Sequence, residues 1–223
     1  MNHAIVKEEK SGVCSLTLNR PEKRNALSCE MIMLLGDAVN ESASTGGSRI
    51  LIIKGGDERA FCAGGDLTES MSSDFGRYVK AIQYLQQSLI NYPFPAIAMI
   101  RGAAIGLGLD LATLCDIRLA GENAYFSANA VRLGRVYHDT QAQRLIRIVG
   151  WGAATEMLLT GRAIDAKQAG KIGLVNQVYP ANLLEGKVYE LAMEMGRNAV
   201  AEAVRDTKSM LRELMQKGIG QGK

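Results

Sequence analysis

Several residue types are scarce in this chain of 223 residues, which has 4 proline, 4 cysteine, 2 histidine and 1 tryptophan residues. The cysteines are far apart and form no C-x-x-C pair; they are Cys14, Cys29, Cys62 and Cys115. His3 and His138 are the only histidines. A Cys/His zinc cage is therefore not expected, and we expect four reduced thiols and no metal site.

Long apolar runs and a strong net charge are also missing. No run approaches the ~20 residues of a membrane-spanning helix, so we expect no membrane partner. The first twenty residues contain the charged stretch Lys7–Lys10, which fits neither a secretory signal nor a transit peptide, and the cytoplasm is the expected location. The net charge of +3 is too small for a nucleic-acid-binding surface.

The rest of the composition is that of a globular protein, with 47% hydrophobic and 22% charged residues and a surplus of glycine (24 residues). A chain of this length buries roughly 70% of its extended surface on folding, which is enough for one hydrophobic core without disulfide bonds or a structural metal. Disorder, collagen and coiled coil are excluded.

The first half of the chain alternates strand-like and helix-like segments. Apolar alternation and short apolar runs predict strands at 13–19, 49–55, 96–100 and 116–120. Helical spacing predicts helices at 28–43, 75–91 and 106–115. Ser28 is placed as the N-cap of the first helix, and Thr45-Gly46-Gly47 as its stop.

Past residue 139 the pattern is mostly helical. We predict helices at 140–149, 151–160, 165–171, 181–196 and 199–217, and one strand within 173–180. Asp165 is the expected N-cap of the third of these helices. The layout is that of an α/β core followed by a helical tail.

Two glycine-rich turns follow strands, "AFCAGGDL" (60–67) and "RGAAIGLGLDLATLCD" (101–116). Small residues let backbone N–H groups approach a ligand, and a helix that starts there points its positive end at the same place. The alternative is that the glycines only permit sharp turns. Neither segment fits the P-loop or the dinucleotide-binding pattern.

With further segments, these turns carry a resemblance to a known family. The chain resembles the crotonase superfamily, the enoyl-CoA hydratase and isomerase family, over 16–28, 60–67, 95–127, 133–135 and 143–180. The resemblance implies a crotonase-like (ClpP/crotonase) α/β spiral of β-β-α units. It also implies a core domain at 1–180 and, at 181–223, an incomplete C-terminal helical region that builds homotrimers or dimers of trimers.

The resemblance also implies an acyl-CoA thioester as substrate and no separate cofactor, because coenzyme A is part of the substrate. The backbone N–H groups of Gly65 and Leu107 are expected to form an oxyanion hole for the thioester oxygen. The expected coenzyme A contacts are Lys23, Arg24, Ala26, Leu27, Ala63, Gly65, Asp66 and Leu67.

Several side chains depart from the hydratase pattern of the family. Asp110 stands where hydratases carry a Glu, so the carboxylate is kept on a shorter side chain. The alternative is that Asp110 only complements the helix dipole, as any acid in a first helical turn does. Ala130 stands at the position of the second hydratase Glu. Because hydration in this family uses two carboxylates, ordinary hydratase activity is not favoured.

Residues 137–139 are polar in a loop that lines the acyl pocket in relatives. Tyr137 stands where the family's methylmalonyl-CoA decarboxylases carry a Tyr, His138 aligns with an acid of other relatives, and Asp139 is a candidate second carboxylate. The alternative is that Asp139 only N-caps the helix at 140–149, with its two neighbours as loop residues.

Together these residues favour an enzyme that stabilises a thioester enolate, with Asp110 as principal acid/base assisted by Tyr137, His138 or Asp139. A single carboxylate suits isomerisation of an enoyl-CoA better than hydration. The alternatives are a malonyl-type decarboxylase, a true hydratase, or a non-catalytic acyl-CoA-binding protein. Cys62 has no histidine close to it in sequence and is expected to be a small buried residue.

Overall fold

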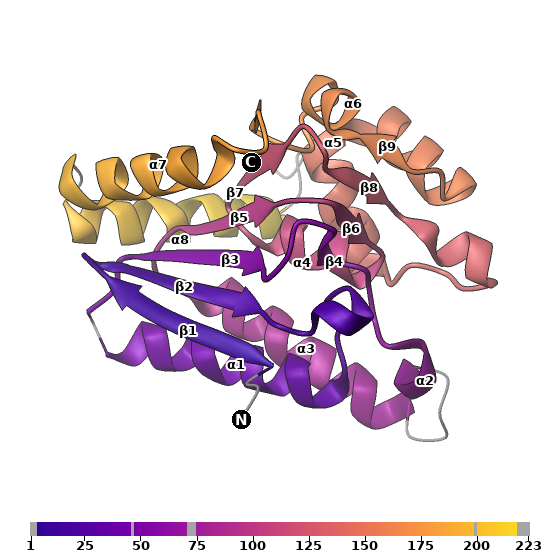
Figure 1. Ribbon diagram of the computed structural model, residues 1–223, viewed down its shortest axis with the longest axis horizontal. Helices are drawn as coiled ribbons and strands as arrows, with labels where there is room; N and C mark the ends of the chain where they lie inside the picture. Colours follow the sequence, from indigo (N-terminus) through magenta and orange to yellow (C-terminus); the bar gives the residue numbers. More distant parts are fainter. Residues whose placement is uncertain (1–3, 46, 71–74, 199, 218–223) are drawn as a thin grey trace.

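The computed structural model describes residues 4–45, 47–70, 75–198 and 200–217 and contains two sheets (Figure 1). The larger sheet has the strand order β1-β2-β3-β5-β7-β10. Its strands are β1 (Ile5–Lys10), β2 (Val13–Leu18), β3 (Ile50–Gly55), β5 (Ala96–Ile100), β7 (Ile117–Gly121) and β10 (Gln177–Tyr179). The smaller sheet consists of β4 (Ala60–Cys62), β6 (Ala103–Ile105), β8 (Tyr125–Ser127) and β9 (Ile164–Asp165).

Helices surround both sheets. They are α1 (Cys29–Ser44), α2 (Leu67–Ser70), α3 (Phe75–Asn91), α4 (Leu107–Leu114), α5 (Asp139–Thr160), α6 (Ala166–Lys171), α7 (Leu184–Asn198) and α8 (Ala201–Lys217), with short 3-10 turns η1 (Pro21–Lys23) and η2 (Asn129–Leu133). Within the described segments, no helix is both long and apolar enough to cross a membrane.

The recurring unit is one strand of each sheet followed by a helical segment. β3 leads into β4 and α2, β5 into β6 and α4, and β7 into β8 and η2. Successive units add parallel strands to both sheets, so the chain advances as a spiral of β-β-α units, as the resemblance implies. Because parallel strands place their carboxyl ends at the same edge, successive turns come together there.

Most predicted elements of the larger sheet and its helices are confirmed. α1 begins after Ser28, whose side chain accepts a hydrogen bond from the Met31 N–H, and it ends at Thr45, whereas Gly46 lies outside the described residues. Asp165 caps α6 as predicted. The break predicted between the helices at 140–149 and 151–160 is confirmed, because α5 is kinked at Gly150, whose backbone is not helical (φ 78°).

The core lies in two layers on the two faces of the larger sheet. On one face, α1 and α3 pack against the apolar side chains of β2, β3 and β5. On the other face, α7 covers a smaller cluster through Leu184, Val188 and Ala192, and α8 runs beside it (Figure 1). The sheet therefore forms the rigid centre that holds the turns at its edge.

Helix α8 is held to the core by two cationic side chains. Lys208 is buried, forms an ion pair with Asp116 at 2.6 Å and donates to the Phe94 carbonyl. Arg212 donates to the carbonyls of Leu89, in the last turn of α3, and Tyr92, the residue after α3, at 3.0 and 2.8 Å. Meanwhile the larger apolar residues of α8 are exposed; these are Met210, Leu211 and Leu214.

Candidate active site

The two glycine-rich turns contact each other, and the contact leaves no space for side chains. A Cβ atom on Gly108, in the first turn of α4, would lie 2.2 Å from the carbonyl oxygen of Cys62 at the end of β4. A Cβ atom on Gly64 would lie 3.1 Å from the carbonyl oxygen of Ile105, and Gly64 has φ +114°. These glycines therefore do more than permit a turn, because each lets one turn lie directly against the other.

The two predicted oxyanion-hole donors are the backbone N–H groups of Gly65 and Leu107. Neither has a backbone acceptor in the described part of the chain. Leu27 pairs with Gly65 as a parallel bridge, in which the Leu27 N–H donates to Gly64 and the Asp66 N–H donates to Leu27. The Gly65 N–H points away from this bridge. Leu107 is the first residue of α4, where an N–H has no partner within the helix.

Tyr78 supports the Gly65 turn from α3, a contact that the sequence did not reveal. Its hydroxyl donates to the Leu27 carbonyl at 2.9 Å, and a Cβ atom on Gly65 would lie 2.4 Å from the same hydroxyl oxygen. Burial raises the pKa of Tyr78 well above its ordinary value, so the hydroxyl stays neutral and remains a donor. The absence of a side chain at Gly65 is thus required by packing.

Asp110 lies one turn after Leu107 on α4 and is 2% exposed, the only buried carboxylate of the described residues. Three side chains donate to it. Gln86 and Gln141 donate to Oδ2 at 3.0 and 3.1 Å, and Arg144 donates to Oδ1 at 2.6 Å in an ion pair. A buried charge needs such compensation, and here α3 and α5 provide it.

Tyr137 lies against the second turn, whereas His138 and Asp139 do not reach it through any hydrogen bond within the described residues. The Tyr137 hydroxyl donates to the Gly106 carbonyl at 3.1 Å, where Gly106 caps α4 with φ 54°. Burial raises the pKa of Tyr137, and the charge of Asp110 adds to this rise. Tyr137 is therefore a neutral group close to the acid.

The predicted N-cap of the helix after residue 139 is wrong. His138, not Asp139, caps α5. The Nδ1 atom of the His138 ring accepts from the Thr140 backbone N–H, and the His138 backbone N–H donates to the Gln141 side-chain oxygen at 3.2 Å. Asp139 is the first helical residue and is exposed, a position where an acid complements the helix dipole.

The predicted coenzyme A segments lie side by side. The Ala63 N–H donates to the Arg24 carbonyl at 3.0 Å, which joins residues 23–27 to residues 63–67. Lys23, Arg24 and Leu67 are exposed, Leu27 is buried, and Ala26, Ala63, Gly65 and Asp66 are half-buried.

Asp66 links these two segments through an ion pair with Arg20 at 2.8 Å. Burial alone would raise the pKa of Asp66. The hydrogen bonds that Asp66 accepts from Arg20 and from the Thr68 N–H outweigh burial and lower that pKa. Asp66 is therefore an ionised structural link in this region.

The remaining candidate groups have clear placements. Ala130 lies half-buried in η2 and brings no carboxylate. Cys62 is fully buried, and burial raises the pKa of its thiol to about 12, so it is not a thiolate nucleophile at neutral pH. Within the described segments, no three His, Cys, Asp or Glu side chains gather in a way that could hold a metal ion.

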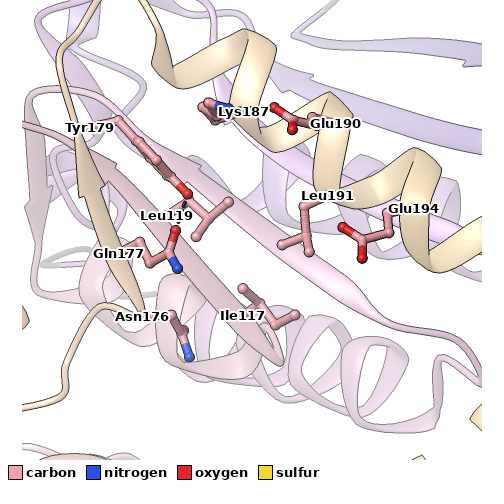
Figure 2. Close-up of a pocket in the computed structure, with 9 residues that line it drawn as sticks. All are labelled: Ile117, Leu119, Asn176, Gln177, Tyr179, Lys187, Glu190, Leu191 and Glu194. Atoms are coloured by element: carbon pink, nitrogen blue, oxygen red, sulfur yellow. Dashed lines mark hydrogen bonds and ion pairs between the residues drawn. The ribbon is translucent and has the colours of Figure 1, made fainter.

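A separate pocket of about 490 Å³ lies between β7, β10 and α7 (Figure 2). Ile117 and Leu119 of β7 line it together with Leu191 of α7, and polar side chains such as Tyr179 and Glu194 also line it. None of the predicted site residues lines it. The groups that can stabilise an oxyanion and move a proton are instead at the two glycine-rich turns.

Comparison with known proteins identifies the family of the chain. The family model described as enoyl-CoA hydratase/isomerase matches residues 8–222. The 2,3-dehydroadipyl-CoA hydratase of Escherichia coli (strain K12) is 36% identical over 223 residues, which are 100% of this chain and 86% of that protein. The human mitochondrial methylglutaconyl-CoA hydratase is 33% identical over 95% of this chain and 64% of its own length.

Solved structures match as well. The crystal structure of an enoyl-CoA hydratase/isomerase family protein from Hyphomonas neptunium superposes with a TM-score of 0.92 and 32% identity. The match covers 100% of this chain and 86% of that one.

Proposed function

Because the chain belongs to the enoyl-CoA hydratase/isomerase family and has its crotonase fold, we propose that it is an acyl-CoA thioester enzyme of the isomerase type. The Gly65 and Leu107 N–H groups hold the thioester oxygen, and Asp110 moves a proton along the acyl chain. The observation that carries this proposal is Asp110, the one buried carboxylate of the described residues, which lies one helical turn after the Leu107 N–H, a group with no backbone acceptor among those residues.

The two donors act on the charge that forms during the reaction. Removal of a proton next to a thioester carbonyl places negative charge on the carbonyl oxygen. Fixed N–H groups and the positive end of α4 stabilise that charge more than they stabilise the substrate. A single donor of this kind is typically worth about 10²–10³ in rate. Gly64 and Gly108 keep the two turns close enough to act together.

The proton transfer needs only one carboxylate. Asp110 takes a proton from C2 of a 3-enoyl thioester, which breaks the C–H bond and forms the enolate. The same proton returns to C4, so that the double bond moves from C3–C4 to C2–C3 and Asp110 is ionised again. Hydration instead needs a second group to orient and split water, and Ala130 brings none.

Tyr137 assists by its contact with the second turn. Its hydroxyl donates to the Gly106 carbonyl, next to the Leu107 N–H, and so fixes the direction of that donor. His138 and Asp139 have a lesser role in this proposal, because His138 caps α5 and Asp139 is exposed. Lys23 and Arg24 are exposed, and the Arg24 carbonyl accepts the N–H of Ala63, the residue after β4. In this proposal their positive charges bind the phosphates of coenzyme A.

Hydration is the second candidate reaction, favoured by the names of the relatives, which are hydratases. Decarboxylation of a malonyl-type thioester is a third, for which Tyr137 is the group that would orient the leaving carboxylate. All three use the same oxyanion hole. They differ in the product, which makes the product the decisive observation.

We also propose assembly into homotrimers or dimers of trimers. The support is the exposed apolar surface of the C-terminal half, which includes Trp151 and Leu159 on α5 and Leu214 on α8, each at least 60% exposed. Exposed apolar groups of this size are typical of subunit contacts. Sedimentation or light scattering of the purified protein tests this assembly.

The experiment that tests the function is incubation with 2-enoyl-, 3-enoyl- and methylmalonyl-CoA thioesters in deuterated water, followed by mass spectrometry. The wild type and Asp110→Asn, which keeps the shape of the side chain, are compared. We expect a double-bond shift that is lost in Asp110→Asn. Coenzyme A thioester binding without any product or deuterium uptake would instead indicate a binding protein.

A further inference from the structure

The acceptor positions of Asp110 are almost all filled. An ionised carboxylate offers about four lone-pair positions. Gln86 and Gln141 fill both positions on Oδ2, at 3.0 and 3.1 Å, and Arg144 fills one position on Oδ1, at 2.6 Å. Among the contacts of the described residues, one acceptor position therefore remains, and it is on Oδ1.

The donors are themselves fixed. The Gln141 carbonyl oxygen accepts the His138 N–H at 3.2 Å, so its amide cannot turn around without breaking the cap of α5. Arg144 is one turn further along α5 and also donates from Nε to Thr113 at 3.3 Å. Thr113 in turn donates to the Asp110 backbone carbonyl at 2.8 Å. The guanidinium thus contacts α4 at two points.

We propose that Arg144 is a positioning residue for the proton transfer, and that it directs Oδ1 of Asp110 to take and return the proton. This inference rests on the proposed function. When the C2–H bond breaks, the proton joins Oδ1 and its electron pair passes into the enolate. The ion pair then changes from neutral to a net positive charge while the substrate becomes negative. The same cation favours the ionised carboxylate, so the contribution of Arg144 is the fixed position that it gives to Oδ1.

The charged and titratable groups that face Asp110 are few. Arg144 comes from α5, and Tyr137 comes from the segment before α5 and stays neutral. The contact from α3 is the uncharged Gln86. Arg144 is therefore the single cation that pairs with this carboxylate in the described structure.

The test measures kcat and KM for a 3-enoyl-CoA thioester in the wild type, Arg144→Gln and Arg144→Lys. Arg147→Gln is the matched control, because this exposed arginine lies three residues further on the same helix. We expect Arg144→Gln to lower kcat by about 10²-fold or more, with KM changed less than about threefold. Arg144→Lys is expected to recover at least about tenfold of the loss, because its ammonium can still donate to Oδ1 in an ion pair.

A second variant covers the case in which Arg144→Gln does not fold. Gln141→Leu keeps the ion pair but removes one donor from Oδ2, and it is expected to lower kcat about tenfold with little change in KM. A kcat within about threefold of the wild type in Arg144→Gln, or no recovery in Arg144→Lys, would overturn the inference and leave the proposed function intact. Absence of turnover in the wild type would overturn both.

Discussion

The contact between the two turns makes Gly108→Ala the most informative small change in the molecule. An added methyl group would lie 2.2 Å from the Cys62 carbonyl oxygen and 2.8 Å from the Cys62 Cβ atom. Ordinary contact at about 3.4 Å requires α4 to move by roughly 1 Å, and overpacking of this kind costs about 1–3 kcal/mol. The better helix propensity of alanine offsets up to about 1 kcal/mol of this cost.

The effect on catalysis is expected to exceed the effect on stability. Leu107 precedes Gly108, so a displacement of roughly 1 Å moves its N–H away from the thioester oxygen, which costs about 10²-fold in rate. Urea unfolding measures the stability, and turnover of a 3-enoyl-CoA thioester measures the rate. Gly152→Ala is the matched control, because nothing lies within 4 Å of a Cβ atom there. A Gly108→Ala protein with wild-type stability and a kcat within about twofold would refute this account of the turns.

Three further predictions follow from the contacts of the site. Because the pKa of Asp66 is lower in the folded protein than in the unfolded chain, the ionised carboxylate stabilises the fold above about pH 4. This stabilisation is lost as the pH falls through the pKa of Asp66 in the folded protein. The difference in unfolding free energy between wild type and Asp66→Asn, about 1–2 kcal/mol at pH 6, is therefore expected to shrink in urea titrations below pH 4. Tyr137→Phe removes the hydroxyl that holds the Gly106 carbonyl, so steady-state kinetics should show kcat lowered roughly tenfold with KM little changed, and an unchanged kcat would exclude this role. Cys62 is buried with a thiol pKa of about 12, so iodoacetamide at pH 8 should leave it unlabelled in the native protein and label it in urea, as read by peptide mass spectrometry.

The fold could be predicted from the sequence wherever an element is long enough to show a period. Helix α3 has the predicted bounds, and α1 has the predicted cap at Ser28. The short strands β4, β6 and β8 were not predicted, because three residues cannot show an alternation and each follows directly on a longer strand. Strand β1 was missed since its charged residues look like a loop, although charge on an edge strand protects it from unwanted pairing.

Some residues of the candidate site could likewise be predicted from the sequence, and others could not. Gly65, Leu107 and Asp110 could be proposed because each belongs to a local motif that follows a strand. Gln86, Gln141 and Arg144 could not, because they reach Asp110 from 24, 31 and 34 residues away along the chain. Only the packing of α3 and α5 against α4 brings these donors to the acid, and no spacing within one segment records that packing.

The central claim is that one buried carboxylate carries one proton between two carbons. The most direct test uses a 3-enoyl-CoA thioester deuterated at C2, in ordinary water, with the position of the label in the product read by mass spectrometry and NMR. Because Asp110 is 2% exposed, we expect part of the deuterium to appear at C4 of the 2-enoyl product, and Asp110→Asn to abolish the conversion. A product that has gained water, or a double-bond shift that persists in Asp110→Asn, would contradict the account.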